Sequence, residues 1–343
     1  MRRMLNTLYV TTQGSYLARQ GETVLVRVEG QTRLRVPIHT LEGIVCFGQV
    51  SASPFLLGLC GEAGVAVSFL SERGRFLARV QGPVAGNVLL RRAQYRLADR
   101  EAESLAIAGA VVLGKIYNCR NVLLRAARNA EEAEAKAQLQ GAAGHLARLS
   151  QELEGAGSLD AVRGCEGEAA RIYFGVFDRL ITSQQEDFAF RRRSRRPPLD
   201  NINALLSFLY TLLVHDVASA LEGVGLDPAV GFLHSDRPGR PSLALDLMEE
   251  LRPVLADRVA LTLVNRRQVR GGGFVKTESG AVMMDDKTRK TVLVGYQKRK
   301  QETLRHPFLD QKLEVGMLAH AQALLLARHL RGDLEGYPPY LWR

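Results

Sequence analysis

The sequence predicts an α+β protein in which a β-sandwich-like domain precedes a larger all-α domain. A chain of 343 residues exceeds the size of one compact core, so two domains are expected. Short β-branched segments separated by turns fill the first 80 residues, whereas later apolar residues recur at helical spacing. We therefore place an N-terminal β domain at 1–82 and a C-terminal α-helical domain at 83–343.

Five short segments of the first domain have the composition of strands, and turn residues lie between them. They are Leu8–Val10, Val24–Val28, Leu34–Ile38, Gly43–Phe47 and Val65–Leu70. One short helix is expected at Ser53–Glu62, with Pro54 in its first turn. The regular spacing of the strands favours a small sheet or sandwich.

The second domain is expected to be helical throughout, with no sheet after residue 85. Apolar periodicity predicts helices over Asn87–Asn129, Ala130–Glu154, Ser158–Thr182, Asn201–Leu221, Ser242–Arg270, Asp285–Leu304 and Leu313–Leu330. The longest apolar run, Leu105–Gly114, is shorter than the roughly 20 residues that a membrane span requires, so no membrane anchor is expected.

Charge and cysteine usage limit the class of partner and the compartment. Lys and Arg number 46 against 36 Asp and Glu, and the resulting +10 charge favours a polyanion, either nucleic acid or an anionic membrane. The four cysteines form no CxxC pair and have no zinc-like spacing. Reduced thiols in a cytoplasmic protein are the interpretation that this pattern favours.

Glu166 is an unusual residue in the helix predicted over Ser158–Thr182. It lies within an apolar stripe, between Val162 and Ala169. A carboxylate on a buried face requires a charged partner or a metal ion. Periodicity alone leaves both readings open: a metal ligand, or a glutamate at the edge of the stripe that pairs with an arginine.

His234 occupies a loop shaped by two prolines and two glycines, just before a predicted helix that contains Asp246 and Glu249. These two acidic residues are three apart and therefore neighbours on one helical face. An ordinary solvated acidic surface would have the same spacing. Together with Glu166, however, the set has the composition of a Mg²⁺ or Mn²⁺ site, because carboxylate oxygens and an imidazole suit those ions.

Basic residues are concentrated between Glu166 and His234. Five arginines occur in six positions, at Arg191, Arg192, Arg193, Arg195 and Arg196, and two prolines follow them. Lys290 and Arg299 belong to two further basic clusters. Few aromatic residues interleave with these charges, so contacts to the phosphate backbone are expected rather than base stacking.

Three segments resemble, in order, the signatures of the Cas1 family of CRISPR-associated endonuclease/integrases. They are Glu166-Gly167-x-Ala169-Ala170-x-x-Tyr173-Phe174, Arg195-Arg196-Pro197-Pro198-x-Asp200-x-x-Asn203-Ala204-Leu205-Leu206-Ser207-Phe208-x-Tyr210, and Leu233-His234 followed by Ser242-Leu243-x-x-Asp246-Leu247-x-Glu249. The resemblance covers essentially the whole chain, including the order of a β and an α domain. The ending Tyr337–Arg343 is similar to that of the type I-C branch.

The resemblance implies a fold, a site and partners that the residues alone do not give. It implies Mg²⁺ or Mn²⁺ held by Glu166, His234 and Glu249, with Asp246 as a further possible ligand. It also implies a homodimer formed through the β domain, a small partner subunit, Cas2, and double-stranded DNA as spacer precursor and CRISPR repeat. The implied activity is metal-dependent insertion of short foreign DNA into a CRISPR array by phosphodiester transesterification.

Two other functions are compatible with the same residues. A structure-selective nuclease on branched DNA in repair would use the same site and differ only in substrate. A non-catalytic basic DNA-binding scaffold would bind without metal and with a steep salt dependence. A scaffold gives no reason to place Glu166, His234 and Glu249 beside bound phosphate.

Overall fold

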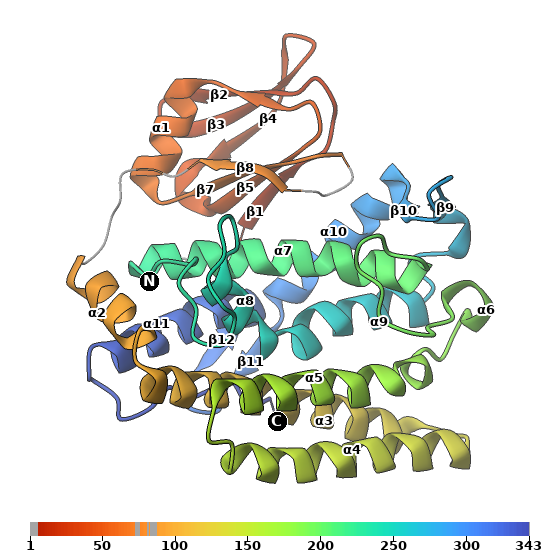
Figure 1. The fold of residues 1–343 in the computed structure, drawn as a ribbon. Coiled ribbons are helices and arrows are strands. Elements are labelled where there is room, and N and C mark those ends of the chain that lie inside the picture. Colours follow the sequence, from red (N-terminus) through yellow and green to blue (C-terminus); the bar gives the residue numbers. More distant parts are fainter. Residues whose placement is uncertain (1–5, 73–75, 81, 83–87, 343) are drawn as a thin grey trace.

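The computed structural model describes residues 6–72, 76–80, 82 and 88–342 (Figure 1). Its N-terminal region contains two four-stranded sheets. The first has the order β1 (Asn6–Val10), β5 (Leu41–Phe47), β7 (Ala66–Leu70) and β8 (Phe76–Val80), and only the β7–β8 pair is antiparallel. The second has the order β4 (Gln31–Pro37), β3 (Thr23–Val28), β2 (Tyr16–Gln20) and β6 (Ser51–Ala52).

The core of this region lies among apolar side chains of both sheets and of helix α1 (Pro54–Ala63). Leu17, Val24, Ile44 and Leu56 are all buried there. The hydroxyl of Ser53 caps α1 by accepting a hydrogen bond from the Leu56 amide. The five predicted strands and this helix are confirmed, whereas β2, β6 and β8 were not anticipated.

Helices dominate the rest of the chain, as predicted. They are α2 (Val88–Ala98), α3 (Glu101–Asn129), α4 (Ala133–Glu154), α5 (Leu159–Gly175), α6 (Gln185–Phe188), α7 (Asn201–Val224), α8 (Ser242–Glu249), α9 (Arg258–Asn265), α10 (Asp286–Gln301) and α11 (Leu318–Leu330). In Figure 1, α7 lies directly below the sheets, and α3, α4 and α5 form the layer farthest from them. The predicted domain boundary at 82/83 borders residues outside the described ones.

The expectation of a sheet-free second domain is wrong. Two small antiparallel hairpins occur there, β9 (Phe274–Lys276) with β10 (Val282–Met284), and β11 (Thr303–Arg305) with β12 (Lys312–Glu314). Each strand has only three residues, too few to show an alternating pattern in the sequence. As a consequence, the predicted helices over Asp285–Leu304 and Leu313–Leu330 are shorter than expected.

The helix predicted over Ser242–Arg270 is divided into three parts, because α8 ends at Glu249 and a π-helical turn (η3, Arg252–Asp257) precedes α9. Pro253 explains the break, since it has no amide hydrogen and its ring clashes with the carbonyl four residues earlier. The helix predicted over Ser158–Thr182 similarly ends at Gly175, and a 3₁₀ turn (η2, Phe177–Leu180) follows. The break after Glu249 shapes the site described below.

Helix α7 joins the β region to the helical region. Phe47 of β5 packs against Phe208 of α7 with ring centroids 6.0 Å apart, and Arg79 of β8 pairs with Glu222. Helices α3 and α7 are, by length and composition alone, long and apolar enough to cross a membrane. Their apolar stretches are, however, 56% and 61% buried inside the protein, so they are the core helices of a soluble fold.

Candidate metal centre and nucleic-acid interface

Helix α5 presents Glu166 beside its buried face. Ser158 caps the helix by accepting a hydrogen bond from the Ala161 amide, and Val162, Ala169 and Tyr173 anchor the apolar side. The Glu166 side chain remains 26% exposed, and its Oε1 accepts a hydrogen bond from the Lys115 ammonium of α3. Glu166 therefore lies at the edge of the stripe with a cationic partner, which is a lysine instead of the arginine considered above.

Glu249 is completely enclosed, with a side chain only 1% exposed. Its Oε2 lies 2.8 Å from Lys115 Nζ, and its Oε1 lies 2.7 Å from Arg252 Nη1. Burial by itself would raise the pKa of Glu249, but the charges of Arg252 and Lys115 outweigh it and lower the pKa to about 2. The carboxylate is thus ionised, and the solvated acidic face considered for this helix is wrong.

Lys115 joins the two carboxylates. Its ammonium contacts both Glu166 and Glu249, although they come from different helices and are far apart in the sequence. Burial lowers the pKa of Lys115, but the two carboxylates more than compensate, so its pKa is raised. The positively charged side chain of Lys115 therefore occupies the space between the two glutamates.

The loop that carries His234 is fixed by Asp246. The Asp246 side chain is 1% exposed; its Oδ2 accepts hydrogen bonds from the amides of Phe232 and Leu233 at 2.6 and 2.9 Å. Its Oδ1 accepts the His234 amide at 2.9 Å and lies 2.7 Å from His234 Nδ1. With Nδ1 engaged by Asp246, Nε2 is the ring nitrogen left to bind a metal ion.

The His234 loop is also tied to α5 and to the acidic centre. Arg163, three residues before Glu166, donates a hydrogen bond from Nε to the Leu233 carbonyl at 2.8 Å. His234 further contributes to the lowered pKa of Glu249. Arg163 thus ties the His234 loop to the helix that carries Glu166, and Asp246 holds the same loop from the side of α8.

Two residues of this centre, Lys115 and Arg252, were missed by the sequence reasoning. Lys115 is the one charged residue in the apolar stretch 105–119, and a solitary charge in a buried helix requires a partner. This single charge in an apolar stretch could have identified Lys115 from the sequence. Arg252 lies three residues after Glu249, but the break in the helix hides the pairing from helical periodicity.

Among the described residues, no three His, Cys, Asp or Glu side chains lie close enough together to coordinate a metal ion. The donor set nevertheless fits a hard divalent cation, with two carboxylates and an imidazole. Glu249 Oε2 is buried and has no hydrogen-bond partner, although Lys115 lies within ion-pair distance of it. The ammonium shows that the space between the glutamates accepts positive charge.

The structure separates the predicted DNA-contacting arginines into two groups. Arg191, Arg192, Arg195 and Arg196 are exposed in the loop before α7. Arg193 is instead turned inward: it donates hydrogen bonds to Asn203 Oδ1 and Ser207 Oγ and lies over the Tyr210 ring. It anchors the loop and is not placed to contact DNA.

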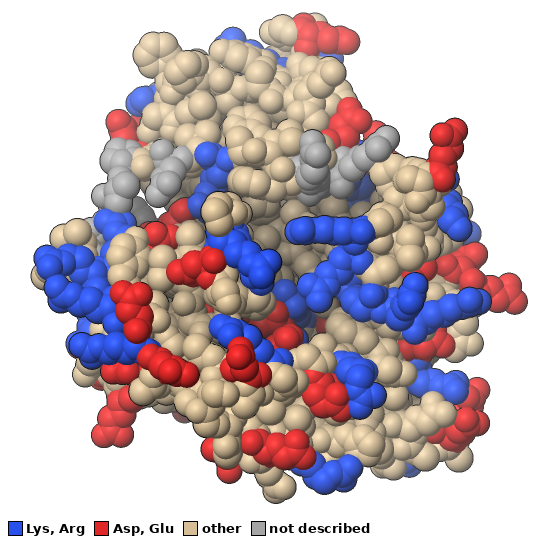
Figure 2. Space-filling model, viewed as in Figure 1, with Lys and Arg blue, Asp and Glu red and all other residues tan. Residues whose placement is uncertain are grey.

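The clusters around residues 290 and 299 are less basic at the surface than their sequences suggest. Lys290 is exposed. Arg299 is mostly buried, pairs with Glu302 and donates to the Val254 carbonyl. Lys300 is buried against Asp216. On the face shown in Figure 2, Lys and Arg side chains gather across the helical region, while the β region above carries few.

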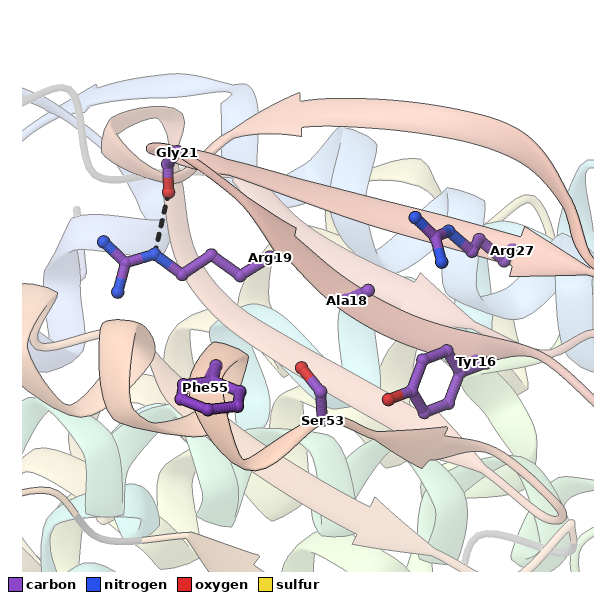
Figure 3. A pocket seen from close by; sticks show the side chains of 7 residues that line it. All are labelled: Tyr16, Ala18, Arg19, Gly21, Arg27, Ser53 and Phe55. Carbon is purple, nitrogen blue, oxygen red and sulfur yellow. Dashed lines mark hydrogen bonds between the residues drawn. The ribbon is translucent and has the colours of Figure 1, made fainter.

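A depression on the β region has a different character (Figure 3). Its volume is about 520 Å³, and it is lined by Tyr16, Ala18, Arg19, Gly21, Arg27, Ser53 and Phe55. The Phe55 side chain is 80% exposed and Tyr16 is 41% exposed. This lining contains aromatic and basic groups but neither carboxylates nor histidines, so the depression does not resemble the centre around Lys115.

Comparisons with known proteins agree with the family resemblance of the sequence. The family model described as "CRISPR associated protein Cas1" matches residues 8–298. The chain is 55% identical to "CRISPR-associated endonuclease Cas1 1" of Chlorobaculum tepidum and 53% identical to "CRISPR-associated endonuclease Cas1 2" of Rhodospirillum rubrum, with all of each chain covered.

Solved structures show the same architecture. A Cas1 protein from Thermotoga maritima is 25% identical, with a TM-score of 0.83 over 95% of this chain and 97% of that chain. A chain of a Cas6-RT-Cas1–Cas2 complex is 23% identical, with a TM-score of 0.82 over 98% of this chain and 36% of that chain, which shows the fold alone. The protein therefore belongs to the Cas1 family of CRISPR-associated endonucleases.

Proposed function

We propose that this Cas1 endonuclease inserts short double-stranded DNA into a CRISPR array at a divalent-metal centre held by Glu166, His234 and Glu249. The observation that carries the assignment is the convergence of Glu166 and Glu249, from two separate helices, on the Lys115 ammonium. Two carboxylates enclosing a cation, beside an oriented histidine and an arginine-rich loop, suit chemistry on a phosphodiester.

The reaction is an exchange of one ester bond for another. The 3′-hydroxyl oxygen of the incoming DNA attacks a phosphorus atom at the repeat boundary, and the bond from that phosphorus to the array's 3′-oxygen breaks. The attacking hydroxyl releases its proton to water, and the departing oxygen gains one. A bound Mg²⁺ or Mn²⁺ would supply Lewis-acid polarisation of the phosphate and stabilise its developing negative charge.

The residues of the chain prepare this centre before substrate arrives. Asp246 holds His234 with Nε2 available, so we assign Asp246 a positioning role and not that of a ligand. Arg252 keeps Glu249 ionised and in place. Lys115 balances the two carboxylates, and once it is released from either one, its ammonium is a donor for a neighbouring phosphate oxygen.

Contacts to DNA are assigned to the exposed arginines of the loop, Arg191, Arg192, Arg195 and Arg196, together with Lys290. Such charges bind the phosphate backbone and position it without reading sequence. The loop is coupled to the centre, because Arg193 and Arg252 both lie over the Tyr210 ring, with guanidinium carbons 5.3 and 4.9 Å from its centroid. DNA held by the loop would therefore lie close to Glu249.

The test is strand transfer into a repeat-containing duplex in Mn²⁺, with Glu166→Ala and His234→Ala beside the unaltered protein. Both variants are expected to lose activity, and Glu168→Ala, on a half-buried residue of the same helix that pairs with Arg171, serves as a matched control. Full activity of either variant would contradict the assigned ligands. Binding of Mn²⁺ without DNA, followed by electron paramagnetic resonance, gives an independent readout.

The same experiment separates the alternatives. A repair nuclease would cleave branched DNA and transfer no strand to the repeat. A scaffold would bind DNA equally well with and without Mn²⁺ and would join nothing. The buried Lys115–Glu249–Arg252 arrangement favours an enzyme, because a scaffold has no use for ionised carboxylates at this depth.

Assembly and compartment complete the proposal. Free cysteines, three of them buried, agree with the reducing cytoplasm. The exposed Phe55 and Tyr16 support a homodimer formed through the β region, and a similar fold occurs in a complex with Cas2. A Phe55→Glu variant should shift sedimentation from dimer to monomer; an unchanged dimer would place the interface elsewhere. The type I-C branch stays a prediction.

A further inference from the structure

The C-terminal segment Tyr337–Trp342, called the strap below, is held inside the helical region instead of lying free on the surface. Tyr337 and Tyr340 are 5% and 1% exposed. The ring of Trp342 lies against the guanidinium groups of Arg125 and Arg258, at 4.6 and 5.2 Å from the ring centroid. The function proposed above assigns this segment no role.

Two hydrogen bonds of the strap are made with the carboxylate of Glu250, the residue after the proposed ligand Glu249. The Glu250 side chain is fully buried, and its Oε2 accepts a hydrogen bond from the Tyr340 amide at 2.6 Å. Its Oε1 accepts one from the Tyr337 hydroxyl and one from Gln322 Nε2 at 3.1 Å. Successive residues thus point to different partners: Glu249 to Lys115 and Arg252, Glu250 to the strap.

Helix α3 forms the other side of the same contact. Asn118 Nδ2 donates to the Glu250 carbonyl at 2.7 Å and to the Tyr340 carbonyl at 2.8 Å, and its Oδ1 accepts the Trp342 amide at 2.7 Å. Gly114 leaves room for the contact, since an added Cβ would lie 3.0 Å from Glu250 and 3.1 Å from Pro339. Lys115 follows Gly114 on the same turn of α3.

The end of α8 requires such support. The last carbonyls of a helix have no intrahelical partner, and α8 has only eight residues before Pro253 prevents it from continuing. Asn118 satisfies the Glu250 carbonyl, and the strap fixes the side chain of the same residue. Glu250, the residue that follows Glu249, is therefore held by α3 and by the strap together.

From these contacts we propose that the strap is a positioning element of the metal centre: by fixing Glu250 against Asn118, it sets the Glu249 carboxylate opposite Glu166 and Lys115. None of its residues is a catalytic residue, because the strap acts only through Glu250 and Asn118. The inference rests on the proposed function for the role of Glu249 as a ligand. The positioning itself can be measured without metal.

The experiment compares the full chain with a variant that lacks residues 337–343, with Tyr337→Phe, and with Trp342→Ala as a matched control. Trp342→Ala removes the ring contacts with Arg125 and Arg258 but keeps the hydrogen bonds to Glu250. Hydrogen–deuterium exchange is measured on α8 and on α5, and the Kd for Mn²⁺ is measured without DNA, well below the unfolding temperature. If the truncated chain does not fold, Tyr337→Phe, which removes the hydroxyl that donates to Glu250, provides the same test.

The truncated chain is expected to exchange faster at the end of α8 and unchanged in α5, and to bind Mn²⁺ at least about tenfold more weakly. Tyr337→Phe should show the same pattern more weakly, and Trp342→Ala should match the unaltered protein. Unchanged α8 exchange in a folded variant that lacks the strap or its hydroxyl would overturn the inference. So would faster exchange with an unchanged Kd for Mn²⁺.

Failure of the proposed function would look different. The unaltered protein would then bind no Mn²⁺, or Glu166→Gln would bind it as tightly as the unaltered protein. The hydrogen–deuterium exchange rates would still test whether the strap positions α8. Faster exchange confined to α8 in the truncated chain supports this role, and equally changed exchange in α8 and α5 contradicts it.

Discussion

Helices α5 and α8 each carry one carboxylate of the centre, and they hold it in opposite ways. Glu166 lies in the middle of a capped 17-residue helix, is 26% exposed and has one charged partner. Glu249 is the last residue of an eight-residue helix, is 1% exposed and has two charged partners from outside that helix. An intact helix fixes the first, whereas distant parts of the chain fix the second.

The comparison shows which part of the site tolerates change. A side chain on a continuous helix keeps its direction because the backbone hydrogen bonds on both sides hold it. A side chain at a helix end loses that support and depends on packing and ion pairs. We therefore expect equivalent substitutions at the two positions to have similar effects on metal binding and unequal effects on stability.

The largest expected difference concerns folding. Glu249→Gln leaves the buried Arg252 without its ion-pair partner and Lys115 with the partly exposed Glu166 alone, and it should reduce the free energy of unfolding by about 3 kcal/mol or more. Glu166→Gln leaves Lys115 paired with Glu249, so its effect should stay below about 1 kcal/mol. Urea unfolding of both variants, with Glu168→Gln as control, measures this. Equal losses for the two would contradict the comparison.

Helix α7 extends the comparison to a titratable group on a continuous helix that is buried against the β region. The His215 ring packs against Phe76 of β8 with centroids 5.0 Å apart, and burial lowers its pKa to about 4. A lowered pKa means that the folded state resists protonation. The contribution of His215 to stability is therefore complete above pH 6.5 and is lost as the pH falls through about 4.

The free energy of unfolding should fall by at most about 3 kcal/mol, which corresponds to the lowering of the His215 pKa from 6.5 to about 4. Chemical unfolding at pH 7, 5 and 4 should show a steeper decline for the unaltered protein than for His215→Gln, whose side chain does not titrate. Parallel declines would indicate that His215 is protonated as easily in the folded as in the unfolded chain.

Asp246 tests whether a positioning residue matters as much as a ligand. Asp246→Asn weakens the hold on three backbone amides and on His234 Nδ1. We expect the affinity for Mn²⁺ to fall about 10- to 100-fold. Isothermal titration without DNA measures the change, and an affinity equal to that of the unaltered protein would show that His234 needs no such support.

Lys115 is expected to give the smallest change in affinity, and in the opposite direction. Lys115→Met removes the cation that lies between the two carboxylates, while Glu249 keeps Arg252. Mn²⁺ should then bind several-fold more tightly, yet strand transfer should decrease because the ammonium no longer reaches the phosphate. If Mn²⁺ binds more tightly and strand transfer is undiminished, Lys115 only competes with the metal ion and has no role in contacting the phosphate.

The sequence by itself determined the class of the fold and the residue types of the centre. Short β-branched segments separated by turns before residue 80 and helical periodicity afterwards predicted the two regions, because both patterns are local. Glu166 was visible as a carboxylate within an apolar stripe, and the order of the three motifs indicated the family. Both features can be recognised in the sequence without knowledge of how the helices pack.

Only the tertiary structure decided how these residues are used. Whether Asp246 and Glu249 face solvent depended on α3 and on the His234 loop, which are distant in sequence. The inward turn of Arg193 and the role of Lys115 depended on partners from other helices. The physical reason is that burial and ion pairing are properties of packed surfaces, and the break at Pro253 interrupts the one local pattern that would have indicated them.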